Sequence, residues 1–269
     1  MNINSVTDRD LEDLIQSADN EDLSILADFI TDQGKGRVAL DGAVCKTLSE
    51  ASKNKTFTQS ERSLLAEELR LFGGNAIANL LRGGRGVQYR EILCDVADHL
   101  KVNYNAKAGV EEIEIGIMTK VLEKSLEDMS EEDKKKLFDE LGFTYSGGAG
   151  PVTSAALLAA ARASGFGVFK LTVIVANAIA KAILGRGIPV VVMAPWLRGL
   201  SILIGPVGWA LTALWTVFDL AAPAYRVTIP CVVQLAYMRQ KAAVKTCKKC
   251  NAPMALDAKF CGECGHATE

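Results

Sequence analysis

Histidine is scarce in this chain of 269 residues, which contains only His99 and His266. General acid–base catalysis uses histidine more often than any other side chain, so few side chains of the preferred type are available for it here. The sequence also lacks a Gly-x-Ser-x-Gly nucleophile motif, a His-Glu-x-x-His zinc-protease motif and a Gly-Lys-Ser/Thr phosphate loop. Together these absences favour a protein that is not an enzyme.

Acidic residues are almost missing from residues 151–246, where Asp219 is the only one beside nine Lys and Arg, a net charge of +8. Residues 1–150 show the reverse, with 28 Asp and Glu against 18 Lys and Arg, a net charge of −10. An acidic part followed by an apolar, basic part suggests a membrane surface, an anionic partner, or docking of one part on the other.

The N-terminal stretch "MNINSVTDRDLEDL" has neither a basic n-region nor an apolar h-region, so we expect no secretory signal peptide. A reducing cytoplasm is then the expected compartment, and the seven cysteines are not expected to form disulfides.

Alternation of apolar and polar residues with period two is nearly absent, so few strands are predicted. Apolar residues recur instead at three- and four-residue spacings, which predicts helices. In the acidic part the predicted helices cover 8–16, 20–30, 58–74, 75–84, 89–102, 109–129 and 130–142. Thr58 with Glu61 has the pattern of a capping box, and Ser130 is the predicted cap of the last of these helices.

Helices are also predicted over 152–165, 168–185 and 231–245, in the apolar part. Prolines at 189, 195, 206, 223 and 230 are predicted to interrupt the chain here. The uncharged stretch "GLSILIGPVGWALTALWTVF" (199–218) has the length of a membrane span. Because Pro206 fits best as the first residue of a helix, the remaining helix of about 13 residues is too short to cross a bilayer. We therefore predict a buried or re-entrant helix.

These patterns predict a mainly α protein. The predicted parts are an acidic helical domain (1–142), a turn-rich linker (143–151), an apolar, basic helical region (152–244) and a small C-terminal zinc ribbon (245–269).

The ribbon is the strongest motif in the chain. In "CKKCNAPMALDAKFCGECGH", two Cys-x-x-Cys pairs lie ten residues apart, a spacing typical of a short zinc ribbon. Cys247, Cys250, Cys261 and Cys264 are the predicted metal ligands, and His266 is expected to be a bystander. Four thiolates leave no open position for a catalytic water, so Zn²⁺ is predicted to be structural. A redox role for the pairs is the weaker alternative.

The small size of the ribbon makes its core depend on few side chains. Met254, Leu256 and Phe260 are the predicted core residues, and Gly265 follows the second pair where a positive φ is commonly needed. Metal binding would contribute about 10 kcal/mol or more to folding such a unit.

A second candidate binding site lies in "LRGGRGVQYRE", where Arg82, Arg85 and Arg90 stand among glycines. They could cradle a phosphate, with Asn79 and Tyr89 nearby. The alternative is a Gly-rich turn between two helices with solvated arginines.

The stretches "LFGGNAIANLLRGGRGVQYREILCDVADHLKV" (71–102) and "AYRVTIPCVVQLAYMRQ" (224–240) resemble the bacterial YaaW-like family, which is related to the ubiquinol–cytochrome c chaperone-type domain. The matching positions are Phe72, Gly73, Gly74, Ile77, Ala78, Asn79, Arg82, Gly83, Tyr89, Arg90, Asp95, Tyr225, Arg226, Val227, Thr228, Ile229, Pro230 and Gln234. The resemblance implies a helical assembly or interaction factor that works near membrane proteins. It supplies no catalytic residue.

The leading hypothesis is therefore a non-enzymatic, chaperone-like protein that binds a protein client and associates with a membrane surface. One alternative is a membrane-inserting or permeabilising protein that uses the apolar helices of 152–220. A further alternative, a nucleic-acid-linked regulator, is disfavoured by the pI of about 5.9. No small-molecule substrate is indicated. The expected location is the cytoplasm, with peripheral or integral association at the inner face of the membrane as the alternative.

Overall fold

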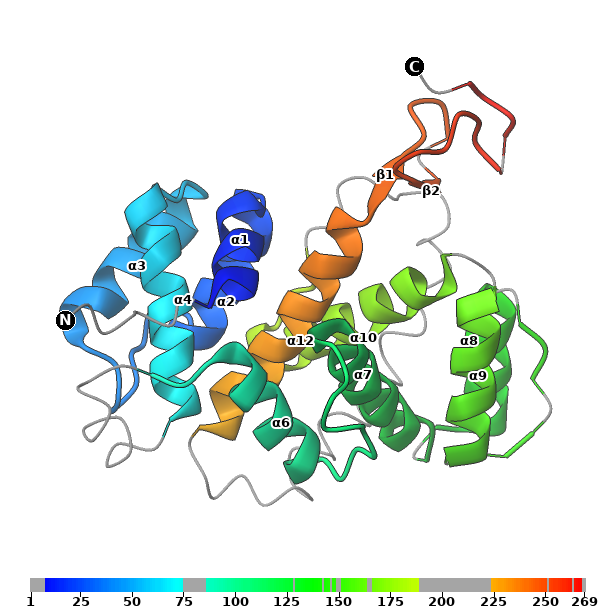
Figure 1. Cartoon of the computed structure of the whole chain (residues 1–269), viewed down its shortest axis with the longest axis horizontal. Helices are drawn as coiled ribbons and strands as arrows, with labels where there is room; N and C mark the ends of the chain where they lie inside the picture. Colours follow the sequence, from blue (N-terminus) through cyan, green and yellow to red (C-terminus); the bar gives the residue numbers. More distant parts are fainter. Residues whose placement is uncertain are drawn as a thin grey trace. The chain divides into compact units, whose positions relative to one another are not determined.

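A computed structural model shows a mainly helical protein. It describes residues 8–74, 86–127, 129–141, 143–145, 147–148, 151–163, 166–188, 224–250, 252–262 and 264–267. Ten helices and two short strands lie within these residues, and Figure 1 labels them. The predicted mainly α fold class is confirmed.

The chain divides into two compact units. The first consists of Met1–Val96 with Pro223–Val232, and the second of Ala97–Ala222 with Val233–Glu269. The linker predicted at 143–151 lies within the second of these units. The domain boundaries that we derived from composition remain a prediction.

The first unit contains four helices: α1 (Arg9–Ser17), α2 (Asn20–Thr31), α3 (Gly42–Asn54) and α4 (Gln59–Gly73). They lie together in Figure 1, coloured from blue to cyan. α2 packs on α3 and α4, and α1 packs on α4. α6 (Tyr89–His99) begins in the same unit. The apolar faces form a core of fully buried side chains that includes Leu11, Ile15, Leu23, Leu26, Leu48, Leu65 and Leu69.

Two predicted helix caps are confirmed. At the start of α4, the Thr58 hydroxyl accepts a hydrogen bond from the Glu61 N–H at 3.3 Å. The Glu61 carboxylate in turn accepts one from the Thr58 N–H at 2.7 Å, which completes the capping box. Ser130 caps α8 (Glu131–Leu141), because its hydroxyl accepts a hydrogen bond from the Asp133 N–H at 3.1 Å.

Helix α3 is absent from the helices predicted by sequence. Its sequence, "GAVCKTLSEASKN", spreads few apolar residues among polar ones. The structure shows what holds it: the Asp41 carboxylate accepts hydrogen bonds from the Ala43 N–H at 2.8 Å and the Val44 N–H at 3.2 Å. Leu48 is fully buried. An N-cap and tertiary packing therefore stabilise a helix with a weak local pattern.

Arg62 of α4 closes the C-terminal end of α1. Its Nη1 donates hydrogen bonds to the carbonyl oxygens of Ile15 at 2.9 Å, Gln16 at 3.2 Å and Ala18 at 2.7 Å. The last carbonyls of a helix have no partner within the helix, and a cation there also matches the helix dipole. A single guanidinium thus satisfies the end of α1 and fixes it to α4.

The second unit contains α7 (Val110–Glu127), α8, α9 (Pro151–Ala163), α10 (Gly167–Leu184) and the C-terminal part of α12 (Tyr225–Ala242). α7, α9 and α10 pack on one another in pairs. Their fully buried residues include Ile113, Ile117, Ala161, Val173, Ala178 and Ala180.

Helix α12 corrects one prediction. Pro230 lies inside this helix, which begins six residues before the predicted start at 231. A proline inside a helix removes the main-chain hydrogen bond to the carbonyl four residues earlier. Burial compensates for that loss, because Val227, Val232 and Leu235 are fully buried around it.

Among the described helices, α10 alone is long and apolar enough to cross a bilayer. However, 72% of its 18-residue window is buried inside the protein. A core helix that is apolar on all sides has the same composition, so α10 is weak support for a membrane span. The uncharged stretch 199–218, the other candidate for a membrane span, lies outside the described residues. The predicted helix over 75–84 also lies outside them.

Candidate metal centre

A small antiparallel hairpin follows α12 after one intervening residue. β1 (Val244–Thr246) pairs with β2 (Pro253–Ala255), with Lys245 opposite Met254. The Lys245 ammonium also donates a hydrogen bond to the Ala258 carbonyl at 2.9 Å. The turn between the strands carries the first Cys-x-x-Cys pair, and the chain after β2 carries the second.

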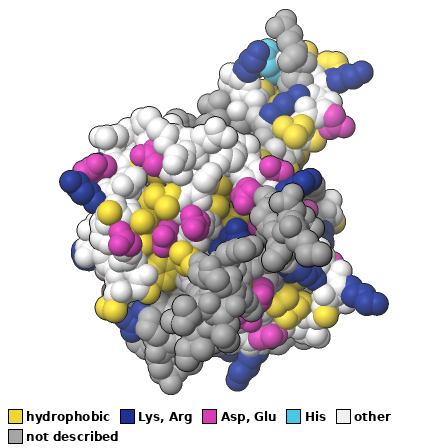
Figure 2. Space-filling view, turned by 60° about the vertical axis from the view of Figure 1, so that its left-hand side comes forward, with side chains coloured by type: hydrophobic (Ala, Val, Ile, Leu, Met, Phe, Trp, Pro, Cys, Tyr) yellow, Lys and Arg dark blue, Asp and Glu magenta, His cyan; other side chains and the backbone are white. Residues whose placement is uncertain are grey.

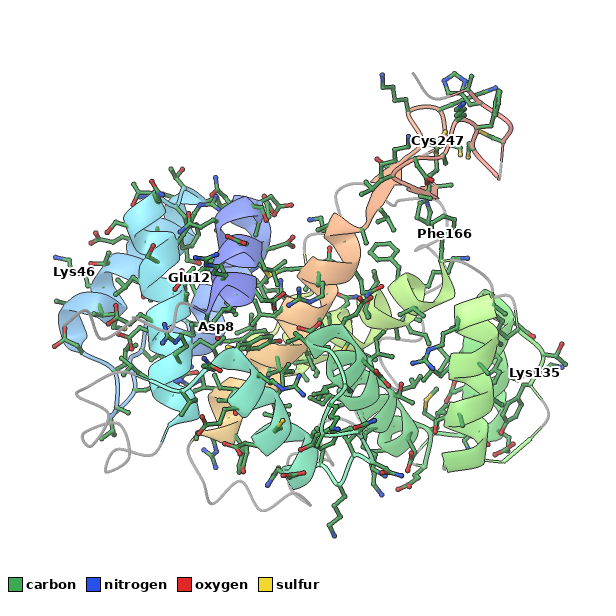
Figure 3. The ribbon with its side chains drawn as sticks, in the orientation of Figure 1. Asp8, Glu12, Lys46, Lys135, Phe166 and Cys247 are labelled. Carbon is green, nitrogen blue, oxygen red and sulfur yellow. The ribbon has the colours of Figure 1, made fainter. Side chains whose placement is uncertain are left out.

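The four cysteine side chains of the ribbon converge. The Sγ atoms of Cys247, Cys250, Cys261 and Cys264 all lie within 4.8 Å of one another. The Sγ atoms of Cys247 and Cys264 are 3.7 Å apart, and those of Cys250 and Cys261 are 3.6 Å apart. A disulfide needs about 2.05 Å, whereas a tetrahedral ion with Zn–S bonds of about 2.3 Å requires S–S separations of about 3.8 Å. The geometry therefore fits a metal ion held by four thiolates; Figure 3 labels Cys247, with the ribbon's sulfur atoms beside it.

Main-chain groups favour the thiolate form of Cys247. Hydrogen bonds from the N–H groups of Cys250 and Lys249 lower the pKa of Cys247 to about 6, the latter at an N···Sγ distance of 3.4 Å. The thiolate is the metal-binding form of cysteine. Gly265 has a φ of +68°, which confirms the predicted role of this glycine, and its N–H donates to the Cys261 carbonyl at 2.9 Å.

The apolar core of the ribbon is smaller than predicted. Met254 is only 2% exposed, as expected, but Leu256 and Phe260 are wrongly predicted as core residues, because they are 58% and 65% exposed. The buried interior consists of Cys247, Ala252, Met254 and Cys261, with Cys250 and Ala258 packed against it. Met254 is thus the one large apolar side chain in this interior, and the others are cysteine and alanine. Figure 2 shows hydrophobic and basic side chains next to one another on the ribbon's surface.

The other candidate ligands lie apart from this cluster. Within the described residues, the group that could hold a metal contains cysteines alone. His266 is exposed, and its carbonyl accepts a hydrogen bond from the Cys261 N–H at 2.8 Å. Cys45, Cys94 and Cys231 are free thiols. Burial raises the pKa of Cys231, which leaves it as an unreactive thiol in the core.

The second set of predicted binding residues is described only in part. Asn79, Arg82 and Arg85 lie outside the described residues. Tyr89 and Arg90 form the first turn of α6; Tyr89 is 0% exposed, so its ring belongs to the core, and Arg90 is half-buried. The phosphate cradle remains a prediction.

Two glycines in the stretch 71–102, Gly73 and Gly86, allow close packing in the first unit. A Cβ on Gly73 would lie 2.3 Å from Cγ1 of Ile92, and a Cβ on Gly86 would lie 2.2 Å from the main-chain carbon of Arg70. The second approach is fixed by two hydrogen bonds: the Val87 N–H donates to the Arg70 carbonyl at 3.1 Å, and Arg70 Nε donates to the Val87 carbonyl at 3.2 Å. Packing thus explains part of the stretch that carries the family resemblance.

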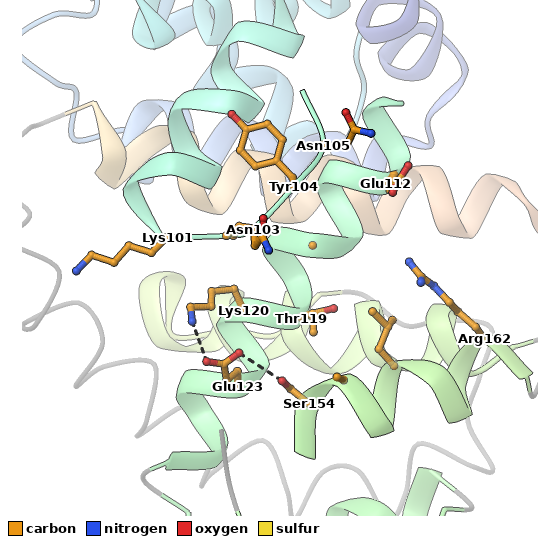
Figure 4. A pocket seen from close by; sticks show the side chains of 14 residues that line it. Lys101, Asn103, Tyr104, Asn105, Glu112, Thr119, Lys120, Glu123, Ser154 and Arg162 are labelled. Carbon is orange, nitrogen blue, oxygen red and sulfur yellow. Dashed lines mark hydrogen bonds and ion pairs between the residues drawn. The ribbon is translucent and has the colours of Figure 1, made fainter. Parts of the chain in front are cut away.

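A cavity in the second unit is lined by residues that no sequence motif marks (Figure 4). They come from the segment after α6, from α7 and from α9. Because tertiary packing alone brings these three segments together, the sequence gives no local signal for the cavity.

Comparison with known proteins places the chain in a family. Residues 62–233 match the family model described as ubiquinol-cytochrome C chaperone. A UPF0174 protein of Helicobacter pylori (strain J99 / ATCC 700824) is 47% identical over 178 residues, which cover 66% of this chain and 70% of that protein. The UPF0174 protein YaaW of Escherichia coli (strain K12) is 33% identical over 249 residues, 89% of this chain and 97% of that protein. No solved structure matches.

The matched region ends before the hairpin that carries the four cysteines, so the family model and the metal centre are separate features of the chain. The similarity to YaaW covers 97% of that protein, and the family model matches residues 62–233 of this chain. The two comparisons therefore agree. The chain belongs to the ubiquinol-cytochrome C chaperone family, and its curated relatives are UPF0174 proteins.

Proposed function

We propose that this protein is a non-enzymatic, chaperone-like factor that binds a protein client. The family description supports a protein partner in general. The metal centre supports a structural role for the ribbon, because four thiolates would occupy all positions of a tetrahedral Zn²⁺ ion and leave none for a catalytic water. In this proposal the ion stabilises the fold of the ribbon, and the ribbon contacts the client.

The observation that carries the proposal is the exposure of two large apolar side chains on the ribbon. Leu256 is 58% exposed and Phe260 is 65% exposed. The lysines at 248, 249 and 259 are also exposed on the ribbon. Exposed aromatic and aliphatic side chains on a rigid support are typical anchors of protein interfaces.

We further propose that the protein works in the cytoplasm at the inner face of the membrane. The charge pattern supports this location, because the apolar part of the chain carries a net charge of +8 and anionic lipid surfaces attract basic segments. α10 supplies an apolar helix, although 72% of its window is buried within the protein, which favours peripheral contact over insertion.

Site-specific photo-crosslinking in cells tests client binding. A photoreactive amino acid replaces Phe260 in one chain and Lys46, whose side chain is 77% exposed on α3, in the control. We expect a discrete protein adduct from position 260 that is lost when a chelator removes the metal, because the ribbon then loses its shape. Equal adducts from both positions, or none from position 260, would contradict the proposal.

Carbonate extraction with protease protection tests the location. Peripheral association predicts that the tagged chain sediments with membranes at low salt and is released by carbonate. Resistance to carbonate would support the membrane-inserting alternative, and complete recovery in the soluble fraction at physiological salt would rule out both.

A further inference from the structure

A cavity of about 670 Å³ opens in the second unit. It is bounded by the segment 101–105, by α7 and by α9, as Figure 4 shows. Small-molecule sites in proteins usually have volumes of about 300–1,000 Å³. The size of this cavity therefore suits a small organic molecule.

One wall of the cavity is fixed by close packing. A Cβ on Gly116 of α7 would lie 3.1 Å from Cγ1 of Val102, so the segment 101–105 rests closely on the helix at that glycine. The Tyr104 hydroxyl donates a hydrogen bond to the Asp98 carboxylate at 3.1 Å, which orients the ring. Both contacts hold the wall in place.

The floor is polar and carries no net charge. The Glu123 side chain is 9% exposed and accepts a hydrogen bond from the Lys120 ammonium at 2.8 Å. It also accepts one from the Ser154 hydroxyl at 3.3 Å. Figure 4 draws both bonds as dashed lines. Since Lys120 and Glu123 neutralise each other, the charge of the cavity is set by its other residues.

Those other charges leave an excess of positive charge. Lys101 and Arg162 line the cavity, and in the part of the chain that the structure describes neither takes part in an ion pair. Glu112 is the remaining acidic lining residue. Figure 4 shows Arg162 at one end of the cavity and Lys101 at the other, with the Lys101 ammonium directed outward. Leu158 and Val102 add apolar surface between polar groups.

We propose that this cavity binds a small organic oxyanion, that is, a phosphate or carboxylate group on an apolar or aromatic body. The planar guanidinium of Arg162 binds two oxygen atoms of the anionic group, a geometry that lysine cannot match. The body of the ligand lies against Val102, Tyr104 and Leu158. Lys101, at the other end, attracts the anion without bonding to it. This site is distinct from the metal centre and independent of the client-binding proposal.

Calorimetric titration and ligand-observed NMR on the full, metal-loaded chain test the proposal with probes of one size and different charge. We expect phenyl phosphate and benzoate to bind and benzylamine, a cation of similar size, not to bind. Inorganic phosphate should bind more weakly than phenyl phosphate because it lacks the apolar body. Vesicles with phosphatidic acid distinguish the source of the anion: binding that phenyl phosphate competes away indicates a lipid headgroup, and absence of vesicle binding indicates a free metabolite.

Two variants locate the site. Arg162→Gln should weaken phenyl phosphate binding about tenfold or more, the typical effect of losing a charge-assisted hydrogen-bond pair. Lys101→Gln should weaken it by less, about two- to threefold, because its effect is long-range and screened by salt. Arg9→Gln is the matched control, since Arg9 is likewise an exposed helical arginine; it should change nothing.

Three results would overturn the proposal. They are equal binding of benzylamine and benzoate, unchanged affinity in Arg162→Gln, and no binding of either anion at about 10 mM, a concentration at which even weak sites fill. Because Arg162 is exposed, its variant should fold normally, and an unchanged melting temperature checks this.

Discussion

Arg239 of α12 holds the carboxylate of Glu114 of α7 through two hydrogen bonds, from Nε at 2.8 Å and from Nη2 at 3.3 Å. The Glu114 side chain is 2% exposed and that of Arg239 is 19% exposed. This bidentate pair fixes the last turns of α12, the helix that leads into β1. The pair thus ties the last turns of α12 to α7 within the second unit.

Removing one partner of this pair should be more harmful than removing both. Arg239→Met leaves the Glu114 carboxylate buried without its cation, which should lower the free energy of unfolding by about 3–5 kcal/mol. Arg239→Met with Glu114→Leu should recover most of that loss, because apolar residues of similar volume can replace a buried pair. Urea unfolding of both variants measures the difference. Lys46→Met, which breaks an exposed pair with Glu50, is the control and should have little effect. Equal destabilisation by the single and double changes would contradict this account.

Gly86→Ala should destabilise the first unit. The added Cβ would lie 2.2 Å from the main-chain carbon of Arg70, and main chain cannot move aside as a flexible side chain can. Such overpacking typically costs about 1–3 kcal/mol. Gly42→Ala is the matched control: no atom lies within 4 Å of its added Cβ, so the substitution should be neutral or slightly stabilising. Thermal melting of the two variants measures the loss of stability. A smaller loss in Gly86→Ala than in Gly42→Ala would contradict the close packing of Gly86 against the main chain of Arg70.

The purified chain should contain one zinc ion bound by the ribbon. Cys264→Ser should abolish or greatly weaken binding, whereas Cys94→Ser, a free thiol outside the cluster, should retain it. Chelation should make the hairpin sensitive to protease and leave the helical signal in far-UV circular dichroism unchanged, because metal binding supplies most of the folding free energy of so small a unit. Metal analysis and limited proteolysis measure these effects. A hairpin that resists protease equally with and without metal would show that its packing is sufficient.

The stability of the first unit should depend on the protonation of Glu68. Burial raises the pKa of this carboxyl group above its ordinary value, with the carboxylates of Glu67 and Asp41 adding to the effect. The folded state therefore binds the proton of Glu68 more tightly than the unfolded state does. Its contribution to stability is present below the unfolded pKa and is lost as pH rises through the folded pKa.

Glu68→Gln should consequently be more stable than the wild type at pH 7, and the advantage should disappear as the pH falls below the ordinary pKa of glutamate. Urea unfolding at a series of pH values measures this. Glu50→Gln, an exposed glutamate of α3, is the control and should show no such trend. A stability difference that does not change with pH would mean that Glu68 is not the titrating group.

Sequence patterns correctly predicted the features that depend on residues close together in the chain. The capping box of Thr58 and Glu61 and the two Cys-x-x-Cys pairs involve residues a few positions apart, so spacing alone identifies them. Helix α3 has little local signal, because its stability comes from packing on α2 and α4 more than from its own pattern. Pro230 lies inside a helix, against the prediction, because burial of its neighbours compensates for a lost hydrogen bond, and only the fold shows that burial.

Spacing along the chain is sufficient to predict the helical class, the cluster of four cysteines and the family resemblance. The exposure of Leu256 and Phe260 on the ribbon depends on the fold, because Cys247, Ala252, Met254 and Cys261 occupy the interior that the hairpin encloses. The fold also pairs Glu114 with Arg239, 125 residues apart, and brings Lys101 and Arg162 to one cavity. Contacts between distant residues arise from how helices pack, and packing is a property of the whole chain that no short window of sequence contains.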